Sequence, residues 1–242
     1  MLIINADDIG RWKNATDLAI TCFKRGRITS ASAMVFMEDS ERASDLATSE
    51  GIDVGLHINL SEKFTGGTVP IRLQEKQEPI CKFLGKSKYA LLFYHPYLRS
   101  QFQYVFQAQY EEFIRLYGRP PSHMDGHFHM HLASNMLFDR IIPYGTKVRR
   151  NFSFFPGEKG ILNRVYRNIV DSWLDRRYRV TNYFFAMLPY DVARLEFVIK
   201  LANTANVELM THPHVPEEYD FLMSYEYGHA ISSVRLGNYY SL

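Results

Sequence analysis

The chain has 242 residues, of which 46% are hydrophobic, so it is long enough to bury a core of its own. Its formal net charge is +2, which gives no reason to expect a nucleic acid or a membrane as partner. The two cysteines lie far apart in the sequence and predict a reduced protein without a disulfide framework. We see no signal peptide and no apolar run of membrane-spanning length, and we expect a cytoplasmic protein.

Short apolar strands alternate with amphipathic helices along the chain. In the first half, we expect strands at 2–6, 28–36 and 53–60 and helices at 15–25, 40–49 and 101–117. In the second half, we expect strands at 122–125, 146–149 and 206–211 and helices at 134–142, 160–178 and 191–205.

Repeated strand–helix units predict an α/β fold in which a parallel sheet is covered by helices on its outside. More than 200 residues of this pattern favour a closed or nearly closed barrel over an open doubly wound sheet. We expect one domain over residues 1–242. Glycines near residue 66 and prolines at 70, 79 and 96 predict an excursion at about 61–98.

Polar side chains follow four of the predicted strands. These side chains are Asp7 and Asp8, His57, then Asp125, His127, His129 and His131, and finally Thr211 and His212. In parallel α/β folds the loops at the carboxyl ends of the strands converge and form the site. Asp and His side chains gathered there are typical of a divalent-metal site, in which an open position binds water.

Taken alone, each of these residues also has an ordinary structural explanation. His57 fits a polar strand position, the Asp pair could cap a helix, and His212 could be a loop residue. The H-x-H-x-H run beside Asp125 is harder to explain as surface sequence and favours metal binding or catalysis.

Four segments in order, "IINADDIG", "DVGLHINL", "PSHMDGHFHMH" and "ELMTHP", resemble the YdjC-like (ChbG-type) carbohydrate deacetylases, as does "RLGNYY" near the C-terminus. The resemblance implies a distorted TIM-barrel-like fold of about seven parallel strands. It implies removal of the N-acetyl group from an amino sugar or chito-oligosaccharide. It also implies a divalent metal, Mg²⁺ by resemblance, although the ligand types also suit Zn²⁺. The chain departs from the family at Ile9 and Thr211, and it matches poorly at 150–190.

Carried over motif by motif, the resemblance implies Asp8, His57 and His127 as metal ligands and Asp7 as the general base. His212 comes from a different strand, and we expect it to protonate the leaving amine. Asp125 is the natural partner to orient a histidine.

His129 and His131 are expected to face the substrate or to support the ligands. On an extended backbone, both could point the way His127 does, which leaves a further nitrogen ligand open as an alternative.

Nine residues between Lys147 and Arg179 are basic and three are acidic, which we interpret as an exposed helix face. If these cations instead formed an anion site, a metal-dependent phosphoesterase would be favoured. A catalytically silent sugar-binding protein is a further alternative, against which the paired carboxylates argue. The aromatic stretch 89–106 favours a helix core or a homodimer contact over a sugar-binding surface. The expected substrate is a small molecule or oligosaccharide.

Overall fold

The structure is a computed structural model that describes residues 1–155, 157–158 and 160–242. The strands are β1 (Leu2–Ile9), β2 (Ser30–Ala33), β3 (Val54–Ile58), β4 (Met124–Gly126), β5 (Tyr183–Ala186), β6 (Val207–Thr211) and β7 (Leu236–Gly237). The helices are α1 (Lys13–Lys24), α2 (Ser40–Ser49), α3 (Ile71–Leu84), α4 (Arg99–Tyr117), α5 (Ser134–Phe138), α6 (Ile161–Arg177), α7 (Val192–Ala202), α8 (Pro216–Met223) and α9 (Tyr225–Ile231). Short 3₁₀ helices are η1 (Ala90–Leu92), η2 (Pro96–Leu98), η3 (His127–Leu132) and η4 (Tyr239–Ser241).

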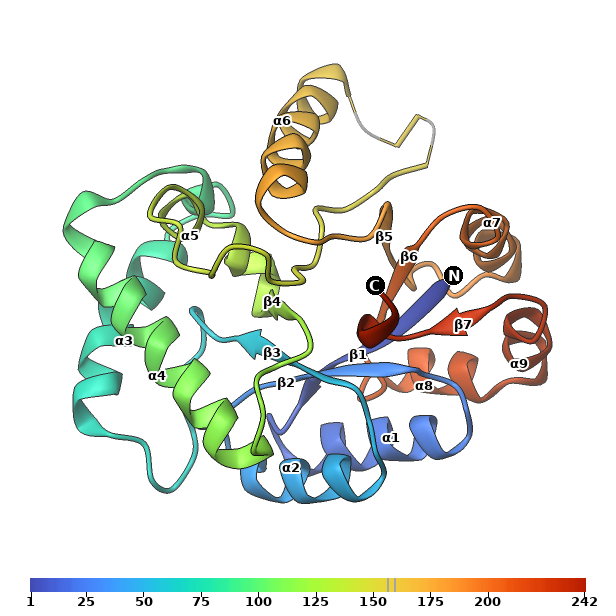
Figure 1. Ribbon diagram of the computed structural model, residues 1–242, viewed down its shortest axis with the longest axis horizontal. Coiled ribbons are helices and arrows are strands. Elements are labelled where there is room, and N and C mark those ends of the chain that lie inside the picture. The colour runs from blue at the N-terminus through green and yellow to red at the C-terminus, as the bar shows by residue number, and fades with distance from the viewer. Residues whose placement is uncertain (156, 159) are drawn as a thin grey trace.

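The strand pairs are parallel and run in the order β4-β3-β2-β1-β6-β5, and β7 also pairs with β1. Strand β1 lies at the centre and is buried along its whole length. The strands curl around a common interior and the helices surround them (Figure 1). This half-barrel confirms the predicted α/β, TIM-barrel-like architecture.

Residues 147–153 continue the ring from β4 towards β5 without a regular ladder. The strand predicted at 146–149 forms only isolated parallel bridges, to β4 and to Arg179. Further along, the Ser153 amide donates to β5 over 2.7 Å. The charged side chain that this segment buries is that of Arg149, whose exposed fraction is 0%.

The excursion at 61–98 contains a full helix, α3, which packs beside α4. Gln77 of α3 and Gln109 of α4 both donate to the Asn59 carbonyl, which follows β3, over 3.3 and 3.1 Å. All three side chains are buried. The excursion therefore braces the loop that leaves the carboxyl end of β3.

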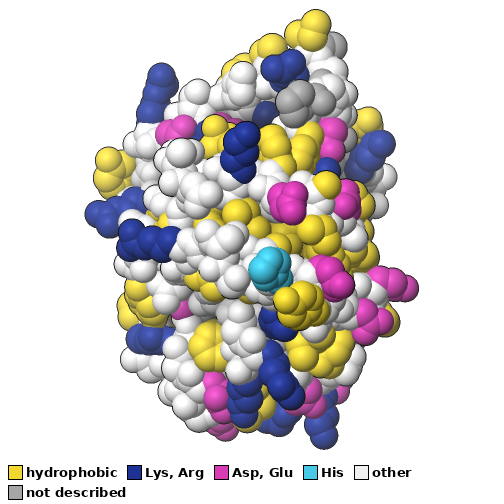
Figure 2. Space-filling view, turned by 90° about the vertical axis from the view of Figure 1, so that its right-hand side faces the viewer, with side chains coloured by type: hydrophobic (Ala, Val, Ile, Leu, Met, Phe, Trp, Pro, Cys, Tyr) yellow, Lys and Arg dark blue, Asp and Glu magenta, His cyan; other side chains and the backbone are white. Residues whose placement is uncertain are grey.

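Charges of both signs are mixed on the side of the molecule that carries α7 and α9. Figure 2 shows acidic, basic and apolar side chains interspersed there, in keeping with the formal net charge of +2. No helix among the described residues combines the length and apolar character needed to cross a membrane.

A buried histidine, His123, fills the interior of the barrel next to β3. Its two ring nitrogens lie 3.0 Å from Ser32 Oγ and 2.9 Å from Ser122 Oγ. The ring stacks on Tyr239 with 3.6 Å between centroids. Gly55 makes room for it, because a Cβ at that position would lie 2.4 Å from the imidazole.

Acidification is expected to destabilise the fold through His123. Burial lowers the pKa of His123 from 6.5 to about 4. Between these two values the unfolded chain binds a proton that the folded chain does not. The free energy of unfolding should therefore fall as the pH drops from about 6.5 to about 4, by up to roughly 3 kcal/mol from this group. Denaturant titrations of wild type and His123→Gln across this range measure the effect, and an equal pH dependence in both would contradict it.

Candidate active site

The carboxyl ends of β1, β3, β4 and β6 meet at one edge of the sheet because these parallel strands lie side by side with β2. The register between β1 and β2 shifts after Ala6, and Asp8 has a φ of 69°, in the left-handed region that side chains rarely adopt. In a regular strand, Asp7 and Asp8 would point to opposite faces. The irregular backbone lets both carboxylates line one cavity.

Asp8, His57 and His127 form a compact buried group. Asp8 Oδ1 lies 3.3 Å from His57 Nε2 and 2.9 Å from His127 Nδ1. This buried oxygen nevertheless accepts no hydrogen bond from the described residues. The three ligand atoms lie within 4.8 Å of one another. One carboxylate oxygen and two imidazole nitrogens are a donor set that proteins use for divalent cations, so these residues fit a metal ion.

Hydrogen bonding and charge prepare His57 for this role. Its Nδ1 lies 2.8 Å from Asp125 Oδ1, so Asp125 holds a proton on Nδ1, and Nε2 is the ring nitrogen that faces Asp8. Burial disfavours the charged ring, but the Asp125 and Asp7 carboxylates outweigh it and raise the pKa of His57 to about 10. Burial also acts to raise the pKa of Asp8, yet the imidazoles of His127 and His57 hold it well below its ordinary value. The carboxylates therefore attract positive charge to this point.

The structure also brings Asp7 and Asp125 together, but here a guanidinium supplies the positive charge. Nη1 and Nη2 of Arg149 each lie 2.6 Å from one oxygen of Asp7. Nη2 also lies 2.7 Å from Asp125 Oδ2, and Nε donates to Glu208 of β6 over 2.8 Å. Arg149 thus balances Asp7 and Asp125, whereas Asp8 Oδ1 faces the imidazoles of His57 and His127.

Arg149 corrects the interpretation of the basic segment 147–179 as an exposed helix face. Arg164 and Arg176 on α6 are exposed as expected, but Arg149 is buried inside the barrel. Burial disfavours the charged guanidinium, yet the carboxylates that it binds raise the pKa of Arg149 well above its ordinary value. One cation of the segment therefore belongs to the interior.

A cavity of 420 Å³ opens beside Asp8, His57 and His127, a volume suited to a small ligand. Every residue predicted to bind metal or to act in catalysis lines it, namely Asp7, Asp8, His57, His127 and His212.

His212 follows β6 and is held by Glu218 of α8. The His212 amide donates to Glu218 Oε1 over 2.8 Å, and the ring Nδ1 lies 3.8 Å from Glu218 Oε2. Burial acts to lower the pKa of His212, but the Glu218, Asp7 and Asp8 carboxylates outweigh it and raise the pKa above its ordinary value.

The histidines after His127 do not continue an extended strand. Within η3, Phe128 and His129 have φ values of 51° and 57°, so the expected alternation of faces does not apply. His129 lines the cavity. His131 instead lies 3.1 Å from the Arg149 carbonyl through its Nε2. His129 therefore faces the cavity, whereas His131 supports the backbone behind it.

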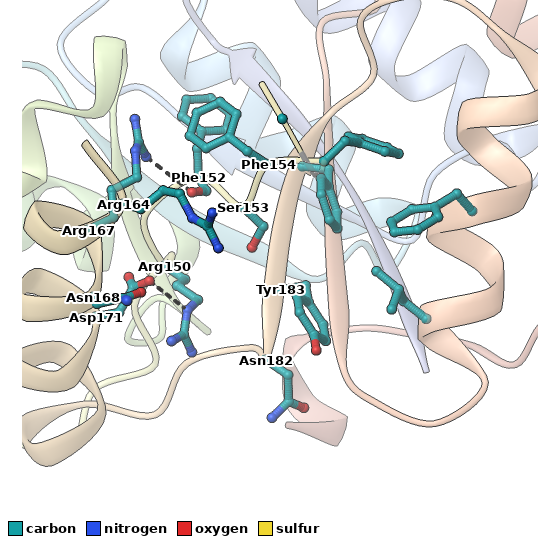
Figure 3. A pocket seen from close by; sticks show the side chains of 15 residues that line it. Arg150, Phe152, Ser153, Phe154, Arg164, Arg167, Asn168, Asp171, Asn182 and Tyr183 are labelled. Atoms are coloured by element: carbon teal, nitrogen blue, oxygen red, sulfur yellow. Dashed lines mark hydrogen bonds and ion pairs between the residues drawn. The ribbon is translucent and has the colours of Figure 1, made fainter. Parts of the chain in front are cut away.

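A second cavity, of 550 Å³, lies between α6 and β5 (Figure 3). Its α6 side carries polar groups and its other side is aromatic; the residues labelled there include Arg164, Arg167, Asn168, Asp171, Phe152 and Tyr183. The Phe152 ring packs edge-on against His129 with 4.3 Å between centroids, so the two cavities share a wall. The segment 150–190, where the family resemblance is weakest, thus builds a pocket beside the site.

Sequence reasoning missed three charged residues at the site, Arg149, Arg11 and Glu62. Arg11 Nη1 lies 3.2 Å from Asp8 Oδ2, and Glu62 Oε1 lies 3.1 Å from His127 Nε2. Arg11 and Glu62 follow the segments "DDIG" and "HINL" within a few positions, which is the signal that could have identified them.

Comparison with known proteins identifies the family of this chain and several relatives. Residues 1–233 match the family model of the YdjC-like proteins. A carbohydrate deacetylase of Mus musculus is 30% identical over 164 residues, which are 66% of this chain and 52% of the mouse protein. A chitooligosaccharide deacetylase of Escherichia fergusonii is 28% identical over 222 residues, which are 88% of this chain and 81% of that protein. The chain spans about half the length of several curated relatives that it matches.

A crystal structure of an Enterococcus faecalis V583 protein, whose name refers to cellobiose-phosphate cleavage, superposes with a TM-score of 0.70. The match covers 99% of this chain and 97% of the other at 19% sequence identity, which shows a shared fold. Because the family model covers nearly the whole chain, the protein belongs to the YdjC-like family.

Proposed function

We propose that this chain is a metal-dependent carbohydrate deacetylase that hydrolyses the N-acetyl group of an amino sugar or a chito-oligosaccharide. The observation that carries the proposal is the buried Asp8 Oδ1, which faces two imidazole nitrogens and accepts no hydrogen bond from the described residues. A second carboxylate, Asp7, lines the same cavity. Relatives named as carbohydrate and chitooligosaccharide deacetylases support the substrate class.

Asp8, His57 and His127 would hold the cation. When bound, it polarises the amide carbonyl and lowers the pKa of a bound water. The family resemblance favours Mg²⁺, whereas the two nitrogen ligands suit Zn²⁺, so the proposal includes both metals.

Asp7 is the proposed general base. Its Oδ1 accepts from Asn5 Nδ2 over 2.9 Å and from Arg149, whereas its Oδ2 accepts from Arg149 alone among the described residues. A carboxylate oxygen has two lone-pair sites. Oδ2 therefore keeps one site with which to take a proton from a water in the cavity, while Arg149 fixes the direction of the carboxylate.

His212 is the proposed general acid. It lines the same cavity as Asp7 and reaches it from β6. The amine that leaves when the amide carbon–nitrogen bond breaks must gain a proton, and the raised pKa of His212 favours a ring that carries one. Glu218 holds the imidazole in place for this transfer.

Three further residues are assigned supporting roles in the proposal. Asp125 orients His57, and His131 supports the backbone of Arg149. His129 lines the cavity and is assigned to the substrate side.

The phosphoesterase alternative has less support. It requires cations of the segment 147–179 to reach a phosphate. Arg149 binds internal carboxylates, and Arg150 pairs with Asp171 and Asp175 at 3.3 and 3.2 Å. The silent sugar-binding alternative differs from the proposal in one observable, the release of acetate.

Acetate release is the direct test. Metal-stripped protein is incubated with N-acetylated mono- and oligosaccharides before and after addition of Mg²⁺ or Zn²⁺. We expect at least one sugar to release acetate only when a metal is present. No acetate from any sugar with either metal would contradict the proposal and favour the silent binder.

Asp7→Asn is expected to lower kcat about 10²- to 10⁴-fold, the usual contribution of a general base, because the amide cannot take the proton. The affinity for the metal should change little, since Asp7 is not among the proposed ligands. Asp45→Asn, which removes an exposed carboxylate on α2, is the control. A loss of only a few-fold in a folded Asp7→Asn protein would remove Asp7 from this role.

His212→Gln is expected to slow hydrolysis of the N-acetyl sugar about 10²- to 10⁴-fold. It should slow p-nitrophenyl acetate far less, because that leaving group departs without a proton. His229→Gln, at an exposed histidine of α9, is the control. Equal losses on the two substrates would show that His212 does not supply the proton.

A further inference from the structure

We infer that Glu62 is a positioning residue, which fixes the His127 ring so that Nδ1 faces the metal. The inference rests on the proposed function, in that it takes Asp8, His57 and His127 as the ligands. It adds to them a carboxylate from the loop that follows β3.

The two ring nitrogens of His127 face two different carboxylates. Nδ1 lies 2.9 Å from Asp8 Oδ1, and Nε2 lies 3.1 Å from Glu62 Oε1. For Nδ1 to bind a metal it must keep its lone pair, so the ring proton belongs on Nε2. The ring is buried, and a buried N–H needs an acceptor. Glu62 Oε1 lies at hydrogen-bond distance from Nε2 without the angle of a hydrogen bond, and we assign it as the acceptor for this N–H.

His57 shows the same arrangement with its nitrogens exchanged. Its Nδ1 faces Asp125 Oδ1 at 2.8 Å, and its Nε2 faces Asp8 Oδ1 at 3.3 Å. Carboxylates that receive the second N–H of a ligating histidine fix its tautomer and its orientation. The site therefore contains two such pairs of a histidine and a carboxylate. Asp125 of β4 serves His57, and Glu62 of the loop after β3 serves His127.

Buried amide side chains hold the backbone of Glu62. Asn59 Oδ1 accepts from the Glu62 amide over 2.9 Å, and Asn59 Nδ2 and Gln77 Nε2 each donate to the Glu62 carbonyl over 2.9 Å. Gln109 of α4 in turn accepts from the Asn59 amide over 2.8 Å. These contacts use backbone atoms of Glu62, so its carboxylate can contact His127 and Arg11.

Arg11 connects Glu62 to the ligand Asp8. Its Nη2 donates to Glu62 Oε1, and its Nη1 lies 3.2 Å from Asp8 Oδ2. The guanidinium also stacks on Trp12 at 4.2 Å, which restricts its movement. Arg11 thus occupies one oxygen of Asp8, leaves Oδ1 to the imidazoles and balances the charge that Glu62 brings.

Metal affinity measured without substrate tests the inference. Zn²⁺ binding to the full chain is measured by calorimetry for wild type, Glu62→Ala and Glu62→Gln. Removing a carboxylate that orients a ligating histidine weakens metal binding by about 10- to 100-fold, which we expect for Glu62→Ala. Glu62→Gln keeps an oxygen acceptor and should lose less. Glu75→Ala removes an exposed carboxylate of α3 and should bind Zn²⁺ like wild type.

A second measurement reports the ring directly. Imidazole ¹⁵N shifts of the Zn²⁺-loaded protein should show His127 bound through Nδ1 with its proton on Nε2 in wild type, and a mixture of the two ring orientations in Glu62→Ala. Because the loop is held through the backbone of residue 62, both variants should fold, which circular dichroism checks. If Glu62→Ala does not fold, Glu62→Met, which keeps the length of the side chain but lacks an oxygen acceptor, decides the question by the same Zn²⁺ titration and the same twofold limit.

The outcomes separate this inference from the proposed function. Zn²⁺ affinity within about twofold of wild type in Glu62→Ala, or the same His127 ring orientation in Glu62→Ala as in wild type, would overturn the positioning role. A wild-type chain that binds metal but releases no acetate with either Mg²⁺ or Zn²⁺ would overturn the deacetylase proposal and leave the positioning role intact. A wild-type chain that binds neither metal would overturn both.

Discussion

The interior of the barrel depends on the burial of one guanidinium, that of Arg149. Taking this cation out of water costs several kcal/mol unless carboxylates surround it. Asp7 of β1, Asp125 of β4 and Glu208 of β6 do so, and they join strands from both sides of the ring. Burial raises the pKa of Glu208 to about 7 even beside the guanidinium, so Asp7 and Asp125 are the principal counter-charges. Arg149 thereby balances the negative charges of Asp7 and Asp125.

The backbone that follows Asp7 keeps Asp8 away from the ion pairs of Arg149. The β1–β2 register shifts there, and Asp8 takes a left-handed conformation that turns its carboxylate towards the two imidazoles. Gly10 completes the turn with a φ of 83°, and a Cβ at that position would lie 2.7 Å from the Met34 carbonyl. The adjacent carboxylates of "IINADDIG" thus acquire different partners: Asp7 pairs with the guanidinium of Arg149, whereas Asp8 Oδ1 faces two imidazoles.

The sequence predicts those parts of the fold and site that depend on local pattern. Alternating strands and helices predict the parallel α/β architecture, and the motifs at the strand ends identify residues that line one cavity. The helix α3 within the predicted excursion at 61–98 was not expected, because prolines disfavour helices and Pro70 precedes α3 while Pro79 lies inside it. Strand β5 is only four residues long and has no polar alternation, so its pattern gave no signal.

The role of Arg149 has no local pattern from which it could be predicted. A basic residue in a basic segment is normally solvent-exposed, and its burial depends on carboxylates from three distant strands. The turn in "HFHMH" likewise has no local pattern that predicts it, since two consecutive left-handed residues are unfavourable without tertiary support. His131 and Arg149 supply some of that support through one contact between η3 and the chain after β4.

The strands of the barrel are joined by regular ladders in one part and by isolated bridges in another. The proposed site lies in the first part and the second cavity beside the other. From β4 through β1 to β5, parallel ladders fix the strands, and Asp8, His57 and His127 lie in or directly after strands of that part. Between β4 and β5, residues 147–153 have isolated bridges, and the charge pairs of Arg149 substitute for a ladder. The second cavity is built from the chain just beyond Arg149 and from α6. Substitutions there can reshape the wall next to His129 while Asp8, His57 and His127 keep the positions that the ladders give them.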